Sequence, residues 1–190
     1  MKKAVLAVAV ALIALPLAAQ SAPLAGTTSQ FGILFGGSKR MNDIPGSQGR
    51  SDVKDFNFTN SVKEIYFGTR LEPDTLFRIK AGEINVPVLV ANSSGGFDKV
   101  KGKIDHVDAI VDYRFSESFG SSGVFGGLGM YRATAPGVAD DTNAGFSFGI
   151  NADLPLSTRY GIIVEGTYHY IRTTVRQRFL TATGGLRFSF

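Results

Sequence analysis

The sequence contains two histidines, and each is a candidate for a catalytic base. His106 lies between two aspartates, and His169 follows Glu165 by four residues. A nucleophilic site also needs a hydroxyl within hydrogen-bonding distance of the histidine. The hydroxyls nearest to His169 in the sequence belong to Thr167 and Thr173, and neither forms a recognisable motif. We therefore interpret the histidines as structural residues that are hydrogen-bonded to their neighbours, and we assign no catalytic residue.

The sequence also gives little support for a metal or cofactor site. Asp140, Asp141 and Asn143 carry side-chain oxygens, but they fall short of the about six to eight oxygens that calcium requires. The glycine-rich stretch 126–129 resembles a phosphate loop only in composition, because no helix pattern follows it. Glycine in a curved strand explains it better. No metal and no cofactor is expected.

Most charged side chains alternate with apolar ones, and this period of two predicts strands rather than helices. The segments have about the 9–11 residues that a tilted strand needs to cross a bilayer. In the segment 124–132 we expect Leu128 and Met130 on the apolar face and Tyr131 on the other. Eight segments show the pattern: 30–37, 62–71, 75–86, 106–115, 124–132, 144–154, 160–171 and 179–190.

The charged side chains fall on one face of these strands and large apolar side chains on the other. An Arg or Lys in the middle of a membrane costs about 2–4 kcal/mol, so we expect the charged face to point into a barrel. Eight strands leave an interior that side chains fill, which favours a structural plug over an ion pathway. The predicted interior network contains Glu64, Arg70, Arg78, Lys80, Asp108, Asp112, Arg114, Glu165 and Arg187.

The hairpin lengths suggest how these charges pair. If the third and fourth segments pair about the middle of their connection, Arg78 lies opposite Asp112, and Lys80 lies between Asp108 and Asp112. If the last two segments pair about Val175, Glu165 lies diagonal to Arg187.

Long and short connections alternate along the chain. The short ones are 72–74, 116–123 and 155–159, and the first begins its turn with a proline. Such alternation is typical of outer-membrane barrels, which have short periplasmic turns and longer outside loops. With both termini in the periplasm, the outside loops are 38–61, 87–103, 133–143 and 172–178.

The last strand carries a further signal. It contains Gly184 and ends on Phe188-Ser-Phe190, with both aromatic rings on the apolar face. This ending resembles the C-terminal strand of small eight-stranded bacterial outer-membrane β-barrels. The resemblance implies that Gly184, Phe188 and Phe190 form an assembly signal read by the barrel assembly machinery. The predicted fold class is all-β, an eight-stranded antiparallel up-and-down transmembrane barrel.

The first residues predict export. Lys2 and Lys3 precede an apolar run, 4–17, and small residues follow it. This is the layout of a signal peptide, and we place it at 1–22 and the barrel domain at 23–190. Loss of the two lysines lowers the formal charge from +4 to +2, so nucleic-acid binding is not expected. The chain contains no cysteine and cannot use disulfides.

These features together predict a monomeric outer-membrane protein, without enzymatic activity, that has a structural or surface-interaction role. Its expected partners are outer-membrane lipids and lipopolysaccharide, whose phosphates suit arginine. Three alternatives stay open: a lipid A-modifying enzyme, a narrow pore, and a soluble ligand-binding barrel with an apolar interior. The residues expected to contact lipopolysaccharide are Arg172, Arg176 and Arg178.

Overall fold

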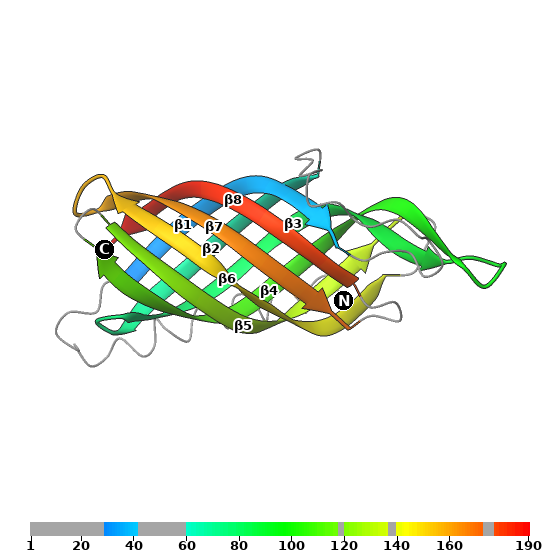
Figure 1. Ribbon diagram of the computed structural model, residues 1–190, viewed down its shortest axis with the longest axis horizontal. Helices are drawn as coiled ribbons and strands as arrows, with labels where there is room; N and C mark the ends of the chain where they lie inside the picture. Colours follow the sequence, from blue (N-terminus) through cyan, green and yellow to red (C-terminus); the bar gives the residue numbers. More distant parts are fainter. Residues whose placement is uncertain (1–28, 42–59, 118–119, 137–139, 173–176) are drawn as a thin grey trace.

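The computed structural model describes residues 29–41, 60–117, 120–136, 140–172 and 177–190. The predicted signal peptide lies outside these ranges. Within them the chain forms eight antiparallel strands in a closed barrel (Figure 1), each paired with its neighbours in sequence and β8 with β1. The predicted fold class is therefore confirmed. The strands are β1 (Ser29–Arg40), β2 (Ser61–Glu72), β3 (Thr75–Ala91), β4 (Phe97–Glu117), β5 (Gly120–Thr134), β6 (Asp141–Pro155), β7 (Tyr160–Ile171) and β8 (Gln177–Ser189).

The two ends of the barrel differ. At one end, which we call the terminal end, Ser29 and Phe190 exchange two backbone hydrogen bonds of 2.9 and 3.0 Å. The connections from β2 to β3, β4 to β5 and β6 to β7 also lie at this end and are short. At the opposite end, which we call the loop end, β1 and β2 are separated by residues 41–60. The central parts of the predicted loops 38–61, 133–143 and 172–178 lie outside the described residues.

The predicted loop 87–103 is instead part of a hairpin. β3 and β4 have 17 and 21 residues and pair as far as Ala91 opposite Phe97. The turn between them is closed by a hydrogen bond of 2.8 Å from the Gly96 amide to Asn92 Oδ1, and Gly95 has a φ of 79°. Figure 1 shows this hairpin projecting beyond the other strands at the loop end.

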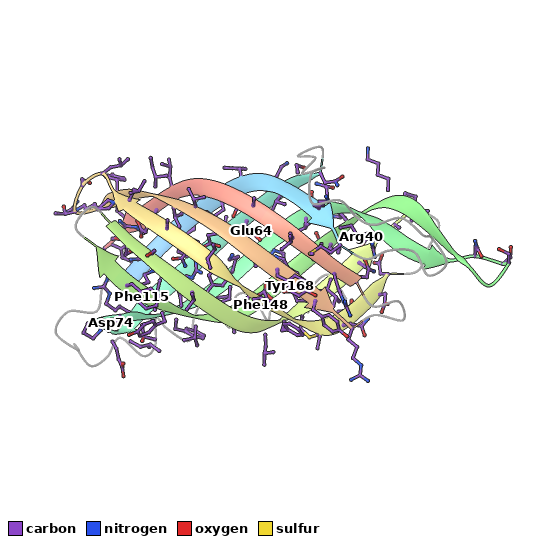
Figure 2. All side chains as sticks on the ribbon, in the orientation of Figure 1. Arg40, Glu64, Asp74, Phe115, Phe148 and Tyr168 are labelled. Atoms are coloured by element: carbon purple, nitrogen blue, oxygen red, sulfur yellow. The ribbon has the colours of Figure 1, made fainter. Side chains whose placement is uncertain are left out.

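The two faces of the sheet separate apolar from charged side chains. Leu128, Ile150 and Leu186 point outward and are 73%, 65% and 65% exposed, whereas Arg78 and Lys80 are fully buried. Figure 2 shows side chains projecting from the outer face along the whole barrel. The expected facing of β5 is confirmed, with Leu128 and Met130 outward and Tyr131 inward. Among the described residues no helix is long and apolar enough to cross a membrane.

Inward glycines make room for large inward neighbours. A Cβ at Gly32 would lie 2.1 Å from Cε1 of Tyr66, and one at Gly129 would lie 2.0 Å from Oδ1 of Asp108. Real Cβ atoms do not approach other atoms so closely. The tyrosine ring and the carboxylate therefore occupy the space that a side chain would need, which is how a narrow barrel accommodates them.

Candidate functional site

The barrel interior holds a buried ionic cluster centred on Glu165 of β7. Its carboxylate accepts hydrogen bonds from Arg78 and Lys80, which both lie on β3. Arg78 Nε lies 3.3 Å from Asp112 Oδ2 on β4, and Lys80 Nζ lies 3.7 Å from Glu64 Oε2 on β2. All five side chains are buried. The cluster therefore ties together β2, β3, β4 and β7, which are not all neighbours in the sheet.

Toward the terminal end the ionic contacts continue through arginine. Arg114 Nε lies 3.1 Å from Asp112 Oδ2, and Arg114 Nη1 donates to Asp153 Oδ2 over 2.7 Å. Arg187 Nε on β8 lies 2.7 Å from the same oxygen of Asp153, and Arg187 donates to Ser189. These contacts add β6 and β8 to the strands that the network joins.

Toward the loop end the network passes to the histidines. His106 Nδ1 lies 2.7 Å from Asp108 Oδ2, and His106 Nε2 lies 3.2 Å from Glu64 Oε1. The ring thus lies between two carboxylates, with its Nδ1 in hydrogen-bonding contact with Asp108. The Tyr131 hydroxyl donates to Asp108 Oδ1 over 2.6 Å and lies 3.2 Å from His169 Nδ1.

His169 marks the end of the polar network. Its Nε2 lies 3.3 Å from the Thr181 hydroxyl, and its ring stacks on Phe179 with centroids 4.7 Å apart. The ring is fully buried. Among the described residues Thr167 is not one of its hydrogen-bond partners, and Thr173 lies outside the described residues. The partner Thr181 comes from the neighbouring strand, and sequence reasoning missed it.

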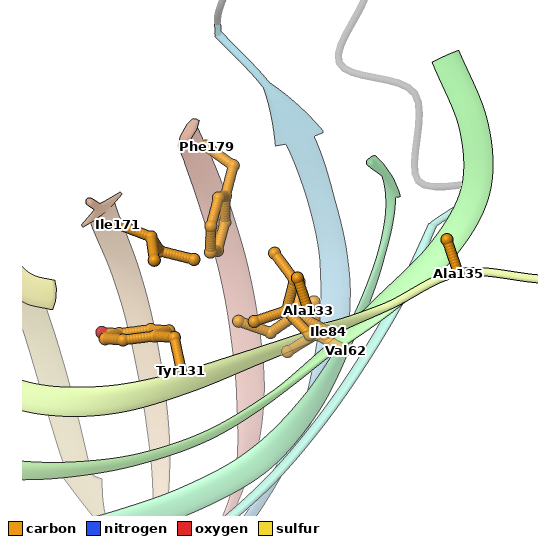
Figure 3. Close-up of a cluster of buried hydrophobic side chains, with 8 residues drawn as sticks. Val62, Ile84, Tyr131, Ala133, Ala135, Ile171 and Phe179 are labelled. Carbon is orange, nitrogen blue, oxygen red and sulfur yellow. The ribbon is translucent and has the colours of Figure 1, made fainter. Parts of the chain in front are cut away.

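Beyond His169 most of the buried side chains are apolar, although Ser38 and Gln177 are also buried there and take part in hydrogen bonds. A cluster of buried side chains, which we call the apolar cap, fills the loop end of the barrel (Figure 3). Sequence reasoning missed the cap because its members come from six strands and the start of one loop, many of them at the margins of the predicted segments. The apolar cap contains Val62, Ile84, Ile104, Tyr131, Ala133, Ala135, Ile171 and Phe179.

The predicted pairing of strands β3 and β4 was wrong by two residues. Arg78 lies opposite Ile110, not Asp112, although its side chain reaches Asp112 diagonally. Lys80 lies opposite Asp108 but forms its ion pairs with Glu64 and Glu165. The turn is centred one residue earlier than the middle of the assumed loop, and this moves each partner by two positions.

The predicted pairing of β7 and β8 was wrong for the same reason. Glu165 lies opposite Thr183, and Arg187 lies opposite Gly161. The two side chains are therefore four positions apart along the ladder. Arg187 pairs with Asp153 instead.

Arg70 differs from the other residues of the predicted network. It is half-buried at the terminal end, where it lines a small recess with Gln30, Asp74 and Arg114. Within the part of the chain that the structure describes, no carboxylate lies within ion-pair distance of Arg70. The other eight residues of the predicted network, together with Asp153, are thus connected in the barrel interior. Arg70 lies outside this network, at the terminal end of the barrel.

The acidic side chains of the 140–143 stretch, which were not expected to bind calcium, have partners within the protein. Asp140 pairs with Arg132, and Asp141 accepts a hydrogen bond from Asn143. Among the described residues no group of three or more acidic or histidine side chains is arranged to hold a metal ion.

The C-terminal aromatic residues lie on the outer face at the terminal end. The rings of Phe188 and Phe190 stack with centroids 5.7 Å apart, and Phe190 also contacts Phe67 at 6.2 Å. Gly184 lies opposite Phe35 of β1. The strand that carries the predicted assembly signal is thus the one that closes the barrel against β1.

Two of the three residues predicted to contact lipopolysaccharide, Arg172 and Arg178, are described by the structure and lie at the loop end. Arg172 is exposed just after β7, and the exposed Arg178 of β8 holds its guanidinium carbon 5.9 Å from the centre of the Tyr170 ring. Arg176 lies outside the described residues.

The closed eight-stranded barrel, with its apolar outer face and ionic interior, has the architecture of the small outer-membrane β-barrels. Solved structures agree. Neisserial surface protein A aligns with a TM-score of 0.61 and 17% identity, over 87% of this chain and 98% of that one. The N-terminal β-barrel domain of Pseudomonas aeruginosa OprF aligns with a TM-score of 0.54 and 14% identity, over 86% and 97%.

A third similar structure is a major outer membrane protein from Thermus thermophilus, with a TM-score of 0.51 and 12% identity over 86% of this chain and 99% of that one. No family model matches the sequence, and no curated protein matches it. The similarity to solved structures therefore establishes the fold. It confirms that the chain resembles the small outer-membrane β-barrels in fold.

Proposed function

We propose that the protein is an integral outer-membrane β-barrel without enzymatic activity, which has a structural or surface-interaction role in the cell envelope. The observation that carries this proposal is the separation of the two faces of the sheet. Large apolar side chains cover the outside, and the charged side chains of the network lie inside; an Arg or Lys facing the middle of the lipid would cost about 2–4 kcal/mol. A soluble ligand-binding barrel needs the opposite arrangement.

The terminal end faces the periplasm in this proposal, and the loop end faces outward. The short connections at the terminal end and the longer ones at the loop end support this orientation. The β3–β4 hairpin, together with loops 38–61, 133–143 and 172–178, then lies outside the cell. This hairpin is the element best placed to meet other molecules, because it projects beyond the membrane-facing part of the barrel.

The buried histidines favour a structural role over an enzymatic one. His169 is fully buried and packs against Phe179 and Tyr131 of the apolar cap, which supports the structural role. The same filling of the interior argues against an open pore, since ion-paired side chains and the cap occupy the barrel from end to end.

The proposed partners follow from the location. Membrane lipids contact the apolar outer face, lipopolysaccharide contacts the outward arginines of the loop end, and the assembly machinery reads Gly184, Phe188 and Phe190. The protein is proposed to be a monomer that reaches the outer membrane after removal of residues 1–22.

Fractionation combined with heat-modifiable gel migration tests the proposal. We expect the protein in the outer-membrane fraction, and we expect unheated samples to migrate differently from boiled ones. Recovery in the periplasmic supernatant without a mobility shift would contradict it.

A further inference from the structure

Four aromatic rings gather on the outer face near the loop end. Phe146 lies directly opposite Tyr170 across β6 and β7, and Phe148 lies opposite Tyr168. The ring centroids of these pairs are 5.0 and 4.9 Å apart, and Phe146 and Phe148 stack at 6.3 Å. Figure 2 shows Phe148 and Tyr168 side by side on the barrel. We call these four residues the aromatic shelf.

Two arginines lie immediately beyond the aromatic shelf. Arg178 lies opposite Tyr170 in the β7–β8 pairing, with its guanidinium over the Tyr170 ring. Arg172 follows Tyr170 by two residues, about 6–7 Å further along the strand direction, and its amide donates to the Ala144 carbonyl over 3.3 Å. Both side chains are exposed, and neither has a carboxylate within ion-pair distance among the described residues.

Two other cations at the same end of the barrel, Lys103 and Arg132, are already neutralised. Lys103 Nζ lies 3.1 Å from Glu83 and 3.2 Å from Asp105. Arg132 pairs with Asp140. These ion pairs occupy the β3–β5 side, so the two arginines beside the aromatic shelf differ from them in being available to an external anion.

We infer that the aromatic shelf, Arg172 and Arg178 form a binding site for one molecule of lipid A, the phosphorylated and acylated diglucosamine of lipopolysaccharide. This inference rests on the proposed function, because it needs the loop end to lie in the outer leaflet. It names a specific lipid and a specific face, β6–β8, where the proposed function names only general contact.

The order of the groups along the barrel matches the order of the groups in the lipid. Acyl chains and sugar rings pack on the faces of the shelf aromatics, which suit the boundary between hydrocarbon and headgroup. The phosphate lies one step further out, where a guanidinium binds it through two parallel hydrogen bonds. The Tyr170 ring under Arg178 limits the orientations of that guanidinium through a cation–π contact.

Native mass spectrometry of the full mature chain in detergent tests the site. The probe is bisphosphorylated hexa-acyl lipid A, mixed in equal amounts with phosphatidylglycerol. We expect one lipid A bound in preference to phosphatidylglycerol, and about a tenfold or greater loss of lipid A affinity in the double variant Arg172→Gln/Arg178→Gln. Tyr170→Leu, which keeps an apolar side chain but removes the ring, should weaken lipid A binding several-fold.

The matched control is Lys103→Gln, which removes a cation from the paired side of the barrel and should change lipid A affinity less than twofold. Heat-modifiable migration of each variant confirms that it is folded. Equal binding of lipid A and phosphatidylglycerol, an equal effect of the double variant and the control, or a dimer that covers β6–β8 would overturn the inference. A wild-type chain that fails to insert into membranes would instead contradict the proposed function.

Discussion

Glu165 is the residue on which the interior network depends most. It accepts from both Arg78 and Lys80, so its loss would leave two buried cations without their shared carboxylate. Removing one partner of a buried ion pair typically costs about 3–5 kcal/mol, because the remaining charge stays desolvated. We therefore expect Glu165→Ala to lower the free energy of unfolding by about this amount, measured by urea titration in detergent with gel mobility as the readout.

Glu83→Ala provides the comparison for Glu165→Ala. Glu83 also pairs with a lysine, Lys103, but both side chains are more than a third exposed. Surface ion pairs contribute about 0–1 kcal/mol, so this variant should unfold close to the wild-type urea midpoint. Similar losses in the two variants would mean that the interior charges do not stabilise the barrel through pairing.

The direction in which each interior charge points could be predicted from the sequence, but the strand register and most of the partners could not. Facing depends only on the alternation within one strand, which is local. Partners depend on register, and a shift of one residue in the centre of a turn moves every pair by two. Arg78 therefore came to lie opposite Ile110. Thr181 as a partner of His169 required the position of a second strand, which no local pattern in the sequence supplies.

Among the elements, the β3–β4 hairpin departs most from expectation. The sequence predicts a loop over residues 87–103, which begin with Pro87, yet β3 continues to Ala91. The reason lies in the neighbouring strands. The pairing of β2 with β3 ends at Val62 opposite Ile84, so beyond this point β3 is an edge strand among the described residues. A proline is tolerated on an edge because it removes no hydrogen bond from a second neighbour.

The terminal strand β8 provides a test that separates assembly from stability. The Phe190 ring is exposed on the outer face and contacts Phe67 and Phe188. We expect Phe190→Ser to reduce the amount of assembled protein in the outer membrane several-fold. The free energy of unfolding of the barrel that does assemble should change by about 1 kcal/mol or less, because the ring is not part of a packed core.

Phe115→Ser is the control for Phe190→Ser, since Phe115 is also an exposed aromatic residue of the outer face near the terminal end. It should assemble normally. If both variants assemble equally poorly, the C-terminal residue acts as one ring among many and not as a signal.

On the scale of the whole molecule, two different fillings close the barrel. Ion pairs occupy it from Arg187 to His106, and the apolar cap seals the loop end. The ionic filling was predictable, because the charges lie on one face of each strand and that face must point away from lipid. The apolar cap was not, because Ile84, Ile104 and Phe179 meet only after the strands are closed into a barrel and extended beyond the membrane-facing belt.

The apolar cap should act as the permeability barrier at the loop end. In planar bilayers we expect no conductance from the wild-type protein. The double variant Ile171→Ser/Phe179→Ser should conduct, because two hydroxyls in place of buried apolar groups admit water to the polar network below. Leu180→Ser, one position further along β8 on the opposite face, should stay closed. If the double variant shows no conductance, as in the wild type, then the ionic network and not the apolar cap is the permeability barrier.

The central claim is that the apolar face of the sheet touches hydrocarbon. The chain contains no cysteine, so a single introduced cysteine can carry a fluorophore at one chosen position. In vesicles whose acyl chains carry bromine, a label at Leu128→Cys should be strongly quenched, and a label at Lys101→Cys on the projecting hairpin should not. Equal quenching at both positions, or none at Leu128→Cys in a folded barrel, would contradict the account.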